Sequence, residues 1–264
     1  MDEQVEASGR DDGSTVAAAG GVGSERAPCC RPSSRGAISA AAVGAAVVAV
    51  RASRRLRRWQ LRWGASEQEA TGALPGDGFV PAADLVTTRA ITVAAPAERV
   101  WPWIAQLGQG RGGFYSYDRL ENLVGCQIHS ADSIVEEWQD VRVGDAVHLH
   151  PEVALEVVAV DPGRALVLRG AVPVAGAAAS NARAAGGRST KGRRADTAAD
   201  APYDFSWAFV LAAGEEEGST RLLVRERYGY LRPSAAALVE PVSVVSFVMT
   251  RRMLRGIRDR AEAA

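Results

Sequence analysis

Two alternating segments joined by an acidic loop place the strongest constraint on how this chain folds. Residues 204–211 (DFSWAFVL) alternate between polar and apolar side chains, and residues 221–230 follow after a loop at 214–219 that holds three glutamates. One face of the first segment consists of Phe205, Trp207, Phe209 and Leu211. Alternation around a Gly-containing loop is typical of a β-hairpin that buries one face, so the pattern predicts part of an antiparallel sheet.

The return segment carries an acid on the face that should turn inward. Its even positions from 222 to 230 are Leu, Val, Glu, Tyr and Tyr, whereas its odd positions include three arginines. The less charged even face should face the core, which places Glu226 among apolar neighbours. A carboxylate there must pair, bind a proton or act chemically. We expect pairing with Arg169 on another predicted strand, and a structural or ligand-orienting role rather than that of a general base.

The remaining periodic segments predict an α+β fold. Strands are expected at 88–94, 146–150, 153–160 and 164–170, and helices from Pro96 to Leu107 and from Tyr117 to Val124. A long C-terminal helix is expected, in which Pro241 marks the start or a kink near the start, with one stripe formed by Val242, Val245, Met249, Met253 and Ile257. Together these elements predict a curved antiparallel β-sheet around a long C-terminal helix, with two short helices after the first strand.

An aromatic segment at 101–122 (WPWIAQLGQGRGGFYSYDRLEN) holds five aromatic rings and four glycines. Its GQGRGG run follows a predicted helix rather than a strand and lacks the GK[ST] ending, so nucleotide binding is not expected. The glycines instead suit a tight turn between two helices. We expect this segment to form one wall of an apolar cavity between the sheet and the C-terminal helix.

Charge and cysteine content exclude several classes of function. The 31 basic and 31 acidic residues balance, so there is no net field to attract nucleic acid. Cys29 and Cys30 are adjacent and Cys126 is alone, which predicts neither a disulfide framework nor a zinc site. His148 and His150 lie two apart on one predicted strand, but no motif joins them to a third ligand, so we expect no metal and no cofactor.

The N-terminal region is predicted to consist of a disordered segment followed by a membrane anchor. Residues 1–35 show no periodicity and are predicted to be disordered. Residues 36–50 are uncharged and would span about 22 Å as a helix, less than the roughly 30 Å hydrocarbon core. Six arginines with Trp59 and Trp63 follow, a pattern typical of a membrane boundary.

We therefore predict a transmembrane helix and basic juxtamembrane segment over 36–63, in a single-pass protein of the cell membrane. The excess of arginine after the apolar run predicts a cytoplasmic main domain. The alternative is an Ala-rich surface helix or disordered head on a soluble cytoplasmic protein. Residues 64–84, rich in Pro and Gly, are predicted to be an extended tether, and residues 175–200, with no apolar side chain larger than Ala, a disordered insert.

From about Leu85 to Glu262 the chain resembles the SRPBCC, or START/Bet v 1-like, superfamily, which includes polyketide cyclases and lipid-transfer domains. The segment at 101–122, HSAD at 129–132 and FVMTRRMLRGIRDRAE at 247–262 are similar to a bacterial branch that often carries an N-terminal apolar segment and an LRWGA-like juncture, here 61–65. The resemblance implies a helix-grip fold for a domain at 85–264. It leaves the activity open, because the superfamily mixes carriers, sensors and enzymes.

The predicted ligand contacts are mostly aromatic and aliphatic. They are Trp103, Leu107, Phe114, Tyr115, Tyr117, Phe205, Trp207, Phe209, Glu226, Tyr228, Val245, Met249 and Met253. An enzyme would draw its acid or base from Tyr115, His129 or Glu226, although each has a simpler structural interpretation. We interpret Asp118 and Glu121 as helix-start carboxylates rather than a catalytic pair.

Three functions remain open from the sequence. The first is a membrane-tethered protein that binds a hydrophobic small molecule or lipid in its cavity. The second is a polyketide cyclase-like or dehydratase-like enzyme. The third is a non-catalytic interaction module whose cavity is filled by its own side chains, and an empty cavity would count against it.

Overall fold

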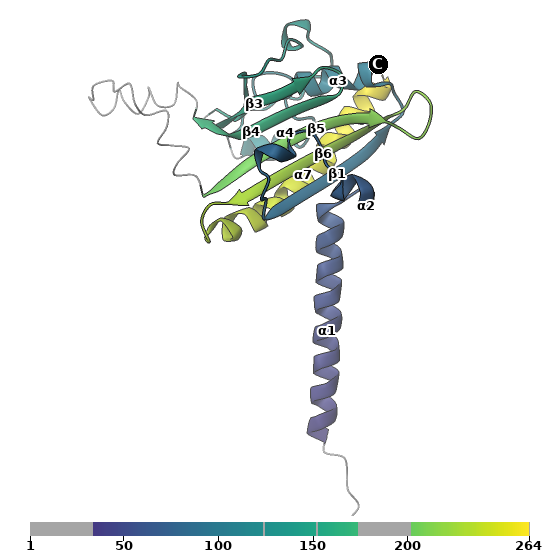
Figure 1. The fold of residues 1–264 in the computed structure, drawn as a ribbon, viewed down its shortest axis with the longest axis vertical. Helices are drawn as coiled ribbons and strands as arrows, with labels where there is room; N and C mark the ends of the chain where they lie inside the picture. Colours follow the sequence, from purple (N-terminus) through teal and green to yellow (C-terminus); the bar gives the residue numbers. More distant parts are fainter. Residues whose placement is uncertain (1–33, 124, 152, 174–201, 264) are drawn as a thin grey trace, which may run out of the picture. The chain divides into compact units, whose positions relative to one another are not determined.

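The computed structural model describes residues 34–123, 125–151, 153–173 and 202–263, without the side chains of 34–40 and 171–173 (Figure 1). The chain separates into two units, residues 1–49 and 50–264. The first helix, α1, covers Ser34–Leu61. Over the described residues, none of the helices is both long and apolar enough to cross a membrane. The disordered segments predicted at 1–35 and 175–200 fall almost wholly outside the described residues.

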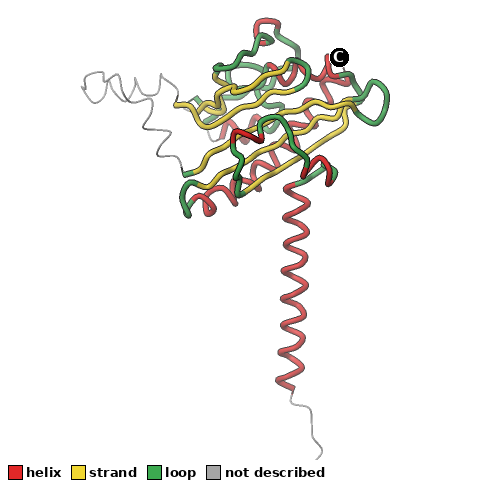
Figure 2. The backbone as a smooth tube through the Cα atoms, in the orientation of Figure 1, coloured by secondary structure: helices red, strands yellow, loops and turns green. Residues whose placement is uncertain are grey.

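A curved six-stranded antiparallel sheet forms the centre of the second unit (Figure 2). The strands are β1 (Leu85–Val93), β2 (Ala146–His150), β3 (Val153–Asp161), β4 (Ala165–Pro173), β5 (Tyr203–Ala213) and β6 (Thr220–Tyr230). They lie in the order β1-β6-β5-β4-β3-β2. The predicted hairpin is confirmed as β5 and β6, and it occupies the middle of the sheet because β1 pairs with the free edge of β6.

Helices cover the inner face of this sheet. They are α3 (Ala97–Ala105), α4 (Asp118–Leu123), the short η2 (Glu136–Trp138) and α7 (Ala235–Ala263). Apolar residues of α3, α7 and the sheet share one buried cluster, which includes Val100, Ile104, Leu254 and Ile257. The predicted α+β helix-grip architecture, with two short helices after the first strand, is therefore confirmed.

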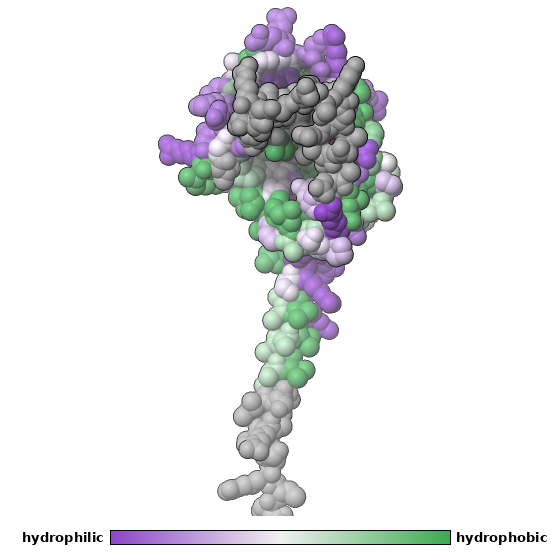
Figure 3. Space-filling model, turned by 90° about the vertical axis from the view of Figure 1, so that its left-hand side faces the viewer, coloured by the Kyte–Doolittle hydropathy of each residue, from purple (hydrophilic) through white to green (hydrophobic). Residues whose placement is uncertain are grey.

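The apolar stripe predicted for α7 is wrong in its first half. Val242 and Val245 are 44% and 62% exposed, whereas Ser243 and Thr250 are buried. Hydrophobic side chains reach the surface of this unit (Figure 3), and those of α7 contribute to them. Helix α7 begins at Ala235, so Pro241 lies within its second turn, near the start of the helix but not at it. The buried hydroxyl of Thr250 faces the ion pair of Arg89 and Glu226.

The segment at 64–84 is not the plain extended tether that was predicted. It contains α2 (Glu67–Thr71) and η1 (Asp77–Phe79), and Ser66 and Glu69 form a capping box at the start of α2. Leu74 and Phe79 pack against the outer face of the sheet. The outward arginines of β6 hold the segment there: Arg221 pairs with Glu69, and Arg225 and Arg227 pair with Asp77.

Candidate functional site

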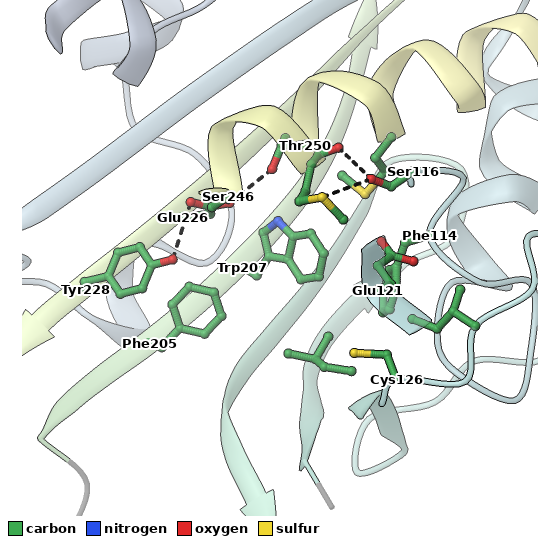
Figure 4. A pocket seen from close by; sticks show the side chains of 14 residues that line it. Phe114, Ser116, Glu121, Cys126, Phe205, Trp207, Glu226, Tyr228, Ser246 and Thr250 are labelled. Carbon is green, nitrogen blue, oxygen red and sulfur yellow. Dashed lines mark hydrogen bonds between the residues drawn. The ribbon is translucent and has the colours of Figure 1, made fainter. Parts of the chain in front are cut away.

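A pocket of about 240 Å³ lies between the inner face of the sheet, α7 and the segment that contains α4 (Figure 4). Its wall is mostly aromatic, aliphatic and sulfur-bearing. The lining residues are Phe114, Ser116, Glu121, Cys126, Ile128, Leu149, Phe205, Trp207, Glu226, Tyr228, Ser246, Met249, Thr250 and Met253. Such a mixture of apolar surface and a few polar groups is how small-molecule sites are built.

The hairpin supplies one wall through strand alternation. Phe205 lies opposite Tyr228 in the β5–β6 register, and Trp207 lies opposite Glu226. Side chains two apart on a strand share a face, so these four project together into the pocket. The Phe205 and Tyr228 rings pack with centroids 4.7 Å apart.

Glu226 forms a buried ion pair with Arg89 on the neighbouring strand β1. Nη1 of Arg89 lies 3.1 Å from Oε1 of Glu226, and both side chains are almost fully buried. Thr87, directly opposite Glu226 in the register, donates to Oε2 at 3.2 Å. Arg169, the expected partner, instead pairs with Asp204 at the surface, because it lies on β4, which β5 separates from β6.

Helix α7 completes the shell of this carboxylate. The hydroxyls of Ser246 and Thr250 both donate to Oε1, and Tyr228 donates to Oε2 at 3.5 Å. Burial, together with the charge of Glu226, raises the pKa of Tyr228. Each oxygen of Glu226 is thus held by several donors, which is the arrangement of a structural ion pair rather than of a general base waiting for a substrate proton.

Glu121 is the less satisfied carboxyl of the pocket wall. Only 8% of the residue is exposed, and its Oε2 atom is buried without a hydrogen-bond partner. Burial raises the pKa of Glu121 to about 7, the negative charge of Asp118 adds to this, and a hydrogen bond with Ser116 opposes it. The interpretation of Glu121 as an ordinary helix-start carboxylate is therefore incomplete, because the start of α4 is packed over the pocket instead of facing water.

The wall contains two further polar groups, the Cys126 thiol and the Trp207 indole. Cys126 is a half-buried free thiol, and burial followed by the charge of Glu121 raises its pKa, so it is held in the neutral form. The indole Nε1 atom of Trp207 is buried without a partner. In Figure 4 Glu121 and Cys126 lie at one end of the pocket and Tyr228 and Phe205 at the other.

Several predicted contacts belong to the core and do not line the pocket. Trp103, Leu107 and Phe209 are buried in the main apolar cluster. Tyr115 is also buried, and its hydroxyl accepts a hydrogen bond from Gln106 at 3.0 Å. Burial raises the pKa of Tyr115, which makes it a poor acid or base near neutral pH.

Two other predicted contacts and one candidate acid or base face solvent. Tyr117 and Val245 are 41% and 62% exposed, and His129 is exposed as well. None of the three lines the pocket. The predicted residues that do line it are Phe114, Phe205, Trp207, Glu226, Tyr228, Met249 and Met253. Ligand binding by these seven stays a prediction.

The polar wall contributed by α7 was not predicted from the sequence. Ser246 and Thr250 lie one turn apart, so both reach Glu226 from the same face. A search for hydroxyl residues at helical spacing opposite the predicted inward acid could have found them. Among the described residues, no group of three or more His, Cys, Asp or Glu side chains could hold a metal ion.

The chain is similar to several solved structures at low sequence identity. No protein-family model matches the chain, and no curated protein does. DynU16, from the dynemicin biosynthetic locus, is similar at 17% identity and a TM-score of 0.34, over 65% of this chain and 46% of its own. The chain therefore spans just under half the length of DynU16.

Two other solved structures match over more of their own length. Truncated norcoclaurine synthase from Thalictrum flavum is 12% identical with a TM-score of 0.37, over 66% of this chain and 91% of its own. Ms6760 from Mycobacterium smegmatis is 20% identical with a TM-score of 0.32, over 68% of this chain and 89% of its own.

Proposed function

We propose that this protein binds a small apolar molecule in the pocket between the sheet and α7, and that it belongs to the START/Bet v 1-like superfamily that its sequence resembles. The observation that carries the proposal is the wall itself, in which aromatic rings and methionines surround a space with few polar atoms. Burying apolar ligand surface against such a wall contributes roughly 25 cal/mol per Å².

The size of the pocket narrows the ligand class. Its volume of about 240 Å³ lies just below the roughly 300–1,000 Å³ of typical small-molecule sites. This favours a compound with one or two rings, or a short acyl chain, over a two-chain lipid. The open pocket also counts against an interaction module whose cavity is filled by its own side chains.

A pair of matched tryptophan variants on α7 tests the binding function. Met249 lines the pocket, whereas Val245, one turn away, is exposed and does not. Native mass spectrometry of the full-length protein should detect a co-purified small molecule that Met249→Trp displaces and Val245→Trp leaves bound. If no molecule co-purifies from several growth media and no apolar dye enters the wild-type protein, the proposal is wrong.

A cyclase or dehydratase activity is the second candidate function. One observation, the buried Glu121, favours it. Glu121 is a buried acid in an apolar pocket with a pKa near neutral, which suits proton transfer. A cyclisation assay with a short poly-β-ketone probe should then show turnover that Glu121→Gln abolishes. Equal product with and without the protein would remove this candidate.

We also propose that the N-terminal segment holds the domain at the cytoplasmic face of a membrane. The proposal is supported by the apolar run at 36–50 and by the exposed arginines Arg51, Arg54, Arg55 and Arg58 that follow it. Cell fractionation tests it. Full-length protein should sediment with membranes and require detergent for release, and recovery in the soluble fraction without detergent would contradict the tether.

A further inference from the structure

The pocket wall carries one acid that nothing in the wall balances. Four of its lining residues are ionisable, namely Glu121, Cys126, Glu226 and Tyr228. Glu226 is balanced by Arg89, and burial raises the pKa of the Cys126 thiol and of the Tyr228 hydroxyl, which keeps both neutral. Glu121 is different, because its Oε2 atom is buried and has no hydrogen-bond partner.

The elements around Glu121 bring it no cation from the wall. Its own helix carries Arg119, which is exposed and does not line the pocket, and Asp118, whose oxygens accept from the backbone N–H and hydroxyl of Ser130. Helix α7 presents Ser246, Met249, Thr250 and Met253, and β5 presents Phe205 and Trp207. From β6 come Glu226, paired with Arg89, and Tyr228.

The strand β2 contributes Leu149 to the wall and places His150 beside the end of α4. A Cβ added to Gly125 would lie 3.5 Å from Nε2 of His150. His150 itself is not among the lining residues. Nor does any Lys, Arg or His line the pocket, as far as the described residues extend.

The rest of the wall suits a cation. The pocket is bounded by the rings of Phe114, Phe205, Trp207 and Tyr228, whose faces attract cations. The acid and the rings also follow one another in space along the pocket. In Figure 4 Trp207 lies between Glu121 at one end and Phe205 at the other. A ligand with a charged head and an apolar body could therefore satisfy both ends at once.

We propose that Glu121 binds the head group of the ligand, and that this head group is a protonated amine carried on an apolar body. The inference rests on the proposed function, since it names the ligand class of the same pocket. An anionic head would face a carboxyl with no cation to balance it. A neutral head could fill the Oε2 valence of the protonated carboxyl, but only a cation also balances the charge of the ionised carboxylate.

The proposal predicts how the affinity for an amine changes with pH. Because the pKa of Glu121 is raised to about 7, its carboxyl is part protonated in the empty pocket near neutral pH. Alkyl amines stay protonated over this range, so their binding requires the carboxylate and should strengthen as the pH rises. From the ionised fraction alone, affinity should rise about tenfold between about pH 6 and pH 8.

Two nearly isosteric probes test this on the full-length protein by isothermal titration calorimetry. They are 2-phenylethylamine and 2-phenylethanol, which differ in the head group alone. We expect the wild type to prefer the amine, and more strongly at the higher pH. Glu121→Gln should weaken amine binding about tenfold or more and leave alcohol binding within about twofold. The exposed Glu137 provides a matched control, since Glu137→Gln should change neither affinity.

The outcomes separate the head-group assignment from the proposed function. If the alcohol binds as well as the amine, or if Glu121→Gln leaves the ratio of the two affinities unchanged, the assignment of Glu121 is wrong while apolar binding stands. If neither probe binds, the amine assignment is wrong, and the co-purification and dye experiments then decide separately whether apolar binding stands. A second variant, Glu121→Leu, removes the carboxyl without an amide, and amine binding that survives in it also overturns the assignment.

Discussion

Arg89 and Glu226 form an ion pair in the interior of the protein, with Nη1 and Oε1 3.1 Å apart and side chains 0% and 4% exposed. Nη1 of Arg89 also donates to the hydroxyls of Ser246 and Thr250 on α7. The pair thereby joins β1, β6 and α7 at the floor of the pocket. It fixes how α7 lies on the sheet, and so the shape of the space between them.

Removing one partner of this pair should destabilise the protein strongly. Arg89→Met leaves a buried carboxylate without its cation, and we expect a loss of about 3–5 kcal/mol in the free energy of unfolding. Urea unfolding at neutral pH measures it. The double variant Arg89→Met/Glu226→Leu should recover part of the loss, because no unpaired charge remains.

A surface pair provides the control for the Arg89 variant. Arg169 pairs with Asp204 at 2.9 Å, but its side chain is 43% exposed. Arg169→Met should therefore cost no more than about 1 kcal/mol. If Arg169→Met and Arg89→Met cost the same, the structural role assigned to the buried pair is wrong.

A close contact between Gly256 and Tyr115 makes α7 sensitive to a single methyl group. A Cβ at Gly256 would lie 2.3 Å from the carbonyl oxygen of Tyr115, which is backbone and cannot rotate away. Ala is favoured over Gly in a helix by about 1 kcal/mol, but the clash should outweigh this and leave a net loss of about 1–3 kcal/mol. Thermal unfolding of Gly256→Ala measures the result.

Gly78→Ala is the matched comparison for Gly256→Ala. A Cβ at Gly78 would meet nothing within 4 Å, and its φ is not in the left-handed region. Its effect on the free energy of unfolding should therefore be small, within about 0.5 kcal/mol. A stabilised Gly256→Ala protein would show that α7 can move away from Tyr115.

Asp77 anchors the segment at 64–84 to the outer face of the sheet. Its Oδ2 atom lies 2.7 Å from Nη1 of Arg225, whose side chain is 3% exposed. Asp77→Asn keeps the shape but removes the charge, and we expect a loss of about 1.5–3 kcal/mol. Limited proteolysis should then cut within 64–84 faster than in the wild type.

The exposed pair of Arg258 and Asp259 serves as the control for Asp77→Asn. Asp259 is 51% exposed and pairs with its sequence neighbour. Asp259→Asn should change stability by less than about 0.5 kcal/mol and leave the cleavage pattern unaltered. Unchanged proteolysis of Asp77→Asn would mean that the apolar contacts of Leu74 and Phe79 suffice to hold the segment.

Strand alternation explains why the sequence predicted one wall of the pocket well. Phe205, Trp207, Glu226 and Tyr228 were all placed inward, and all four line the pocket. The face of a strand residue depends on its position alone, so this part of the site is local information. The capping box of Ser66 and Glu69 was equally local, and it could have predicted α2.

The other wall depends on contacts between residues far apart in the chain. Ser246 and Thr250 face inward because Arg89 and Glu226 need their hydroxyls, and Arg89 is more than 150 residues away. The helical spacing of Val242 and Val245 predicts that they face the core. The buried pair of Arg89 and Glu226 instead turns the hydroxyl face of α7 inward, so these two valines are exposed. Likewise, Glu121 looks like a helix-start acid until α4 is packed over the pocket.

Glu121 should make stability depend on pH in a direction opposite to that of most carboxylates. Its pKa is about 7 in the folded protein against an ordinary value of 4.5, so the folded state binds the proton more tightly than the unfolded state. Its contribution is fully present below about pH 4.5 and is lost as the pH rises through 7. Relative to Glu121→Gln, the wild type should lose roughly 1–3 kcal/mol over this range, since the pocket mouth lets solvent reduce the full effect.

Urea unfolding of the wild type and of Glu121→Gln at about pH 5 and about pH 8 measures this difference. The two proteins should be similar in stability at the lower pH, and the variant should be the more stable one at the higher pH, because an uncharged amide carries no ionisation penalty in the buried site. Glu137→Gln, at an exposed position, should follow the wild type at both. A stability difference between wild type and Glu121→Gln that does not change with pH would show that Glu121 titrates like a solvated carboxyl, and that its environment is wetter than the pocket implies.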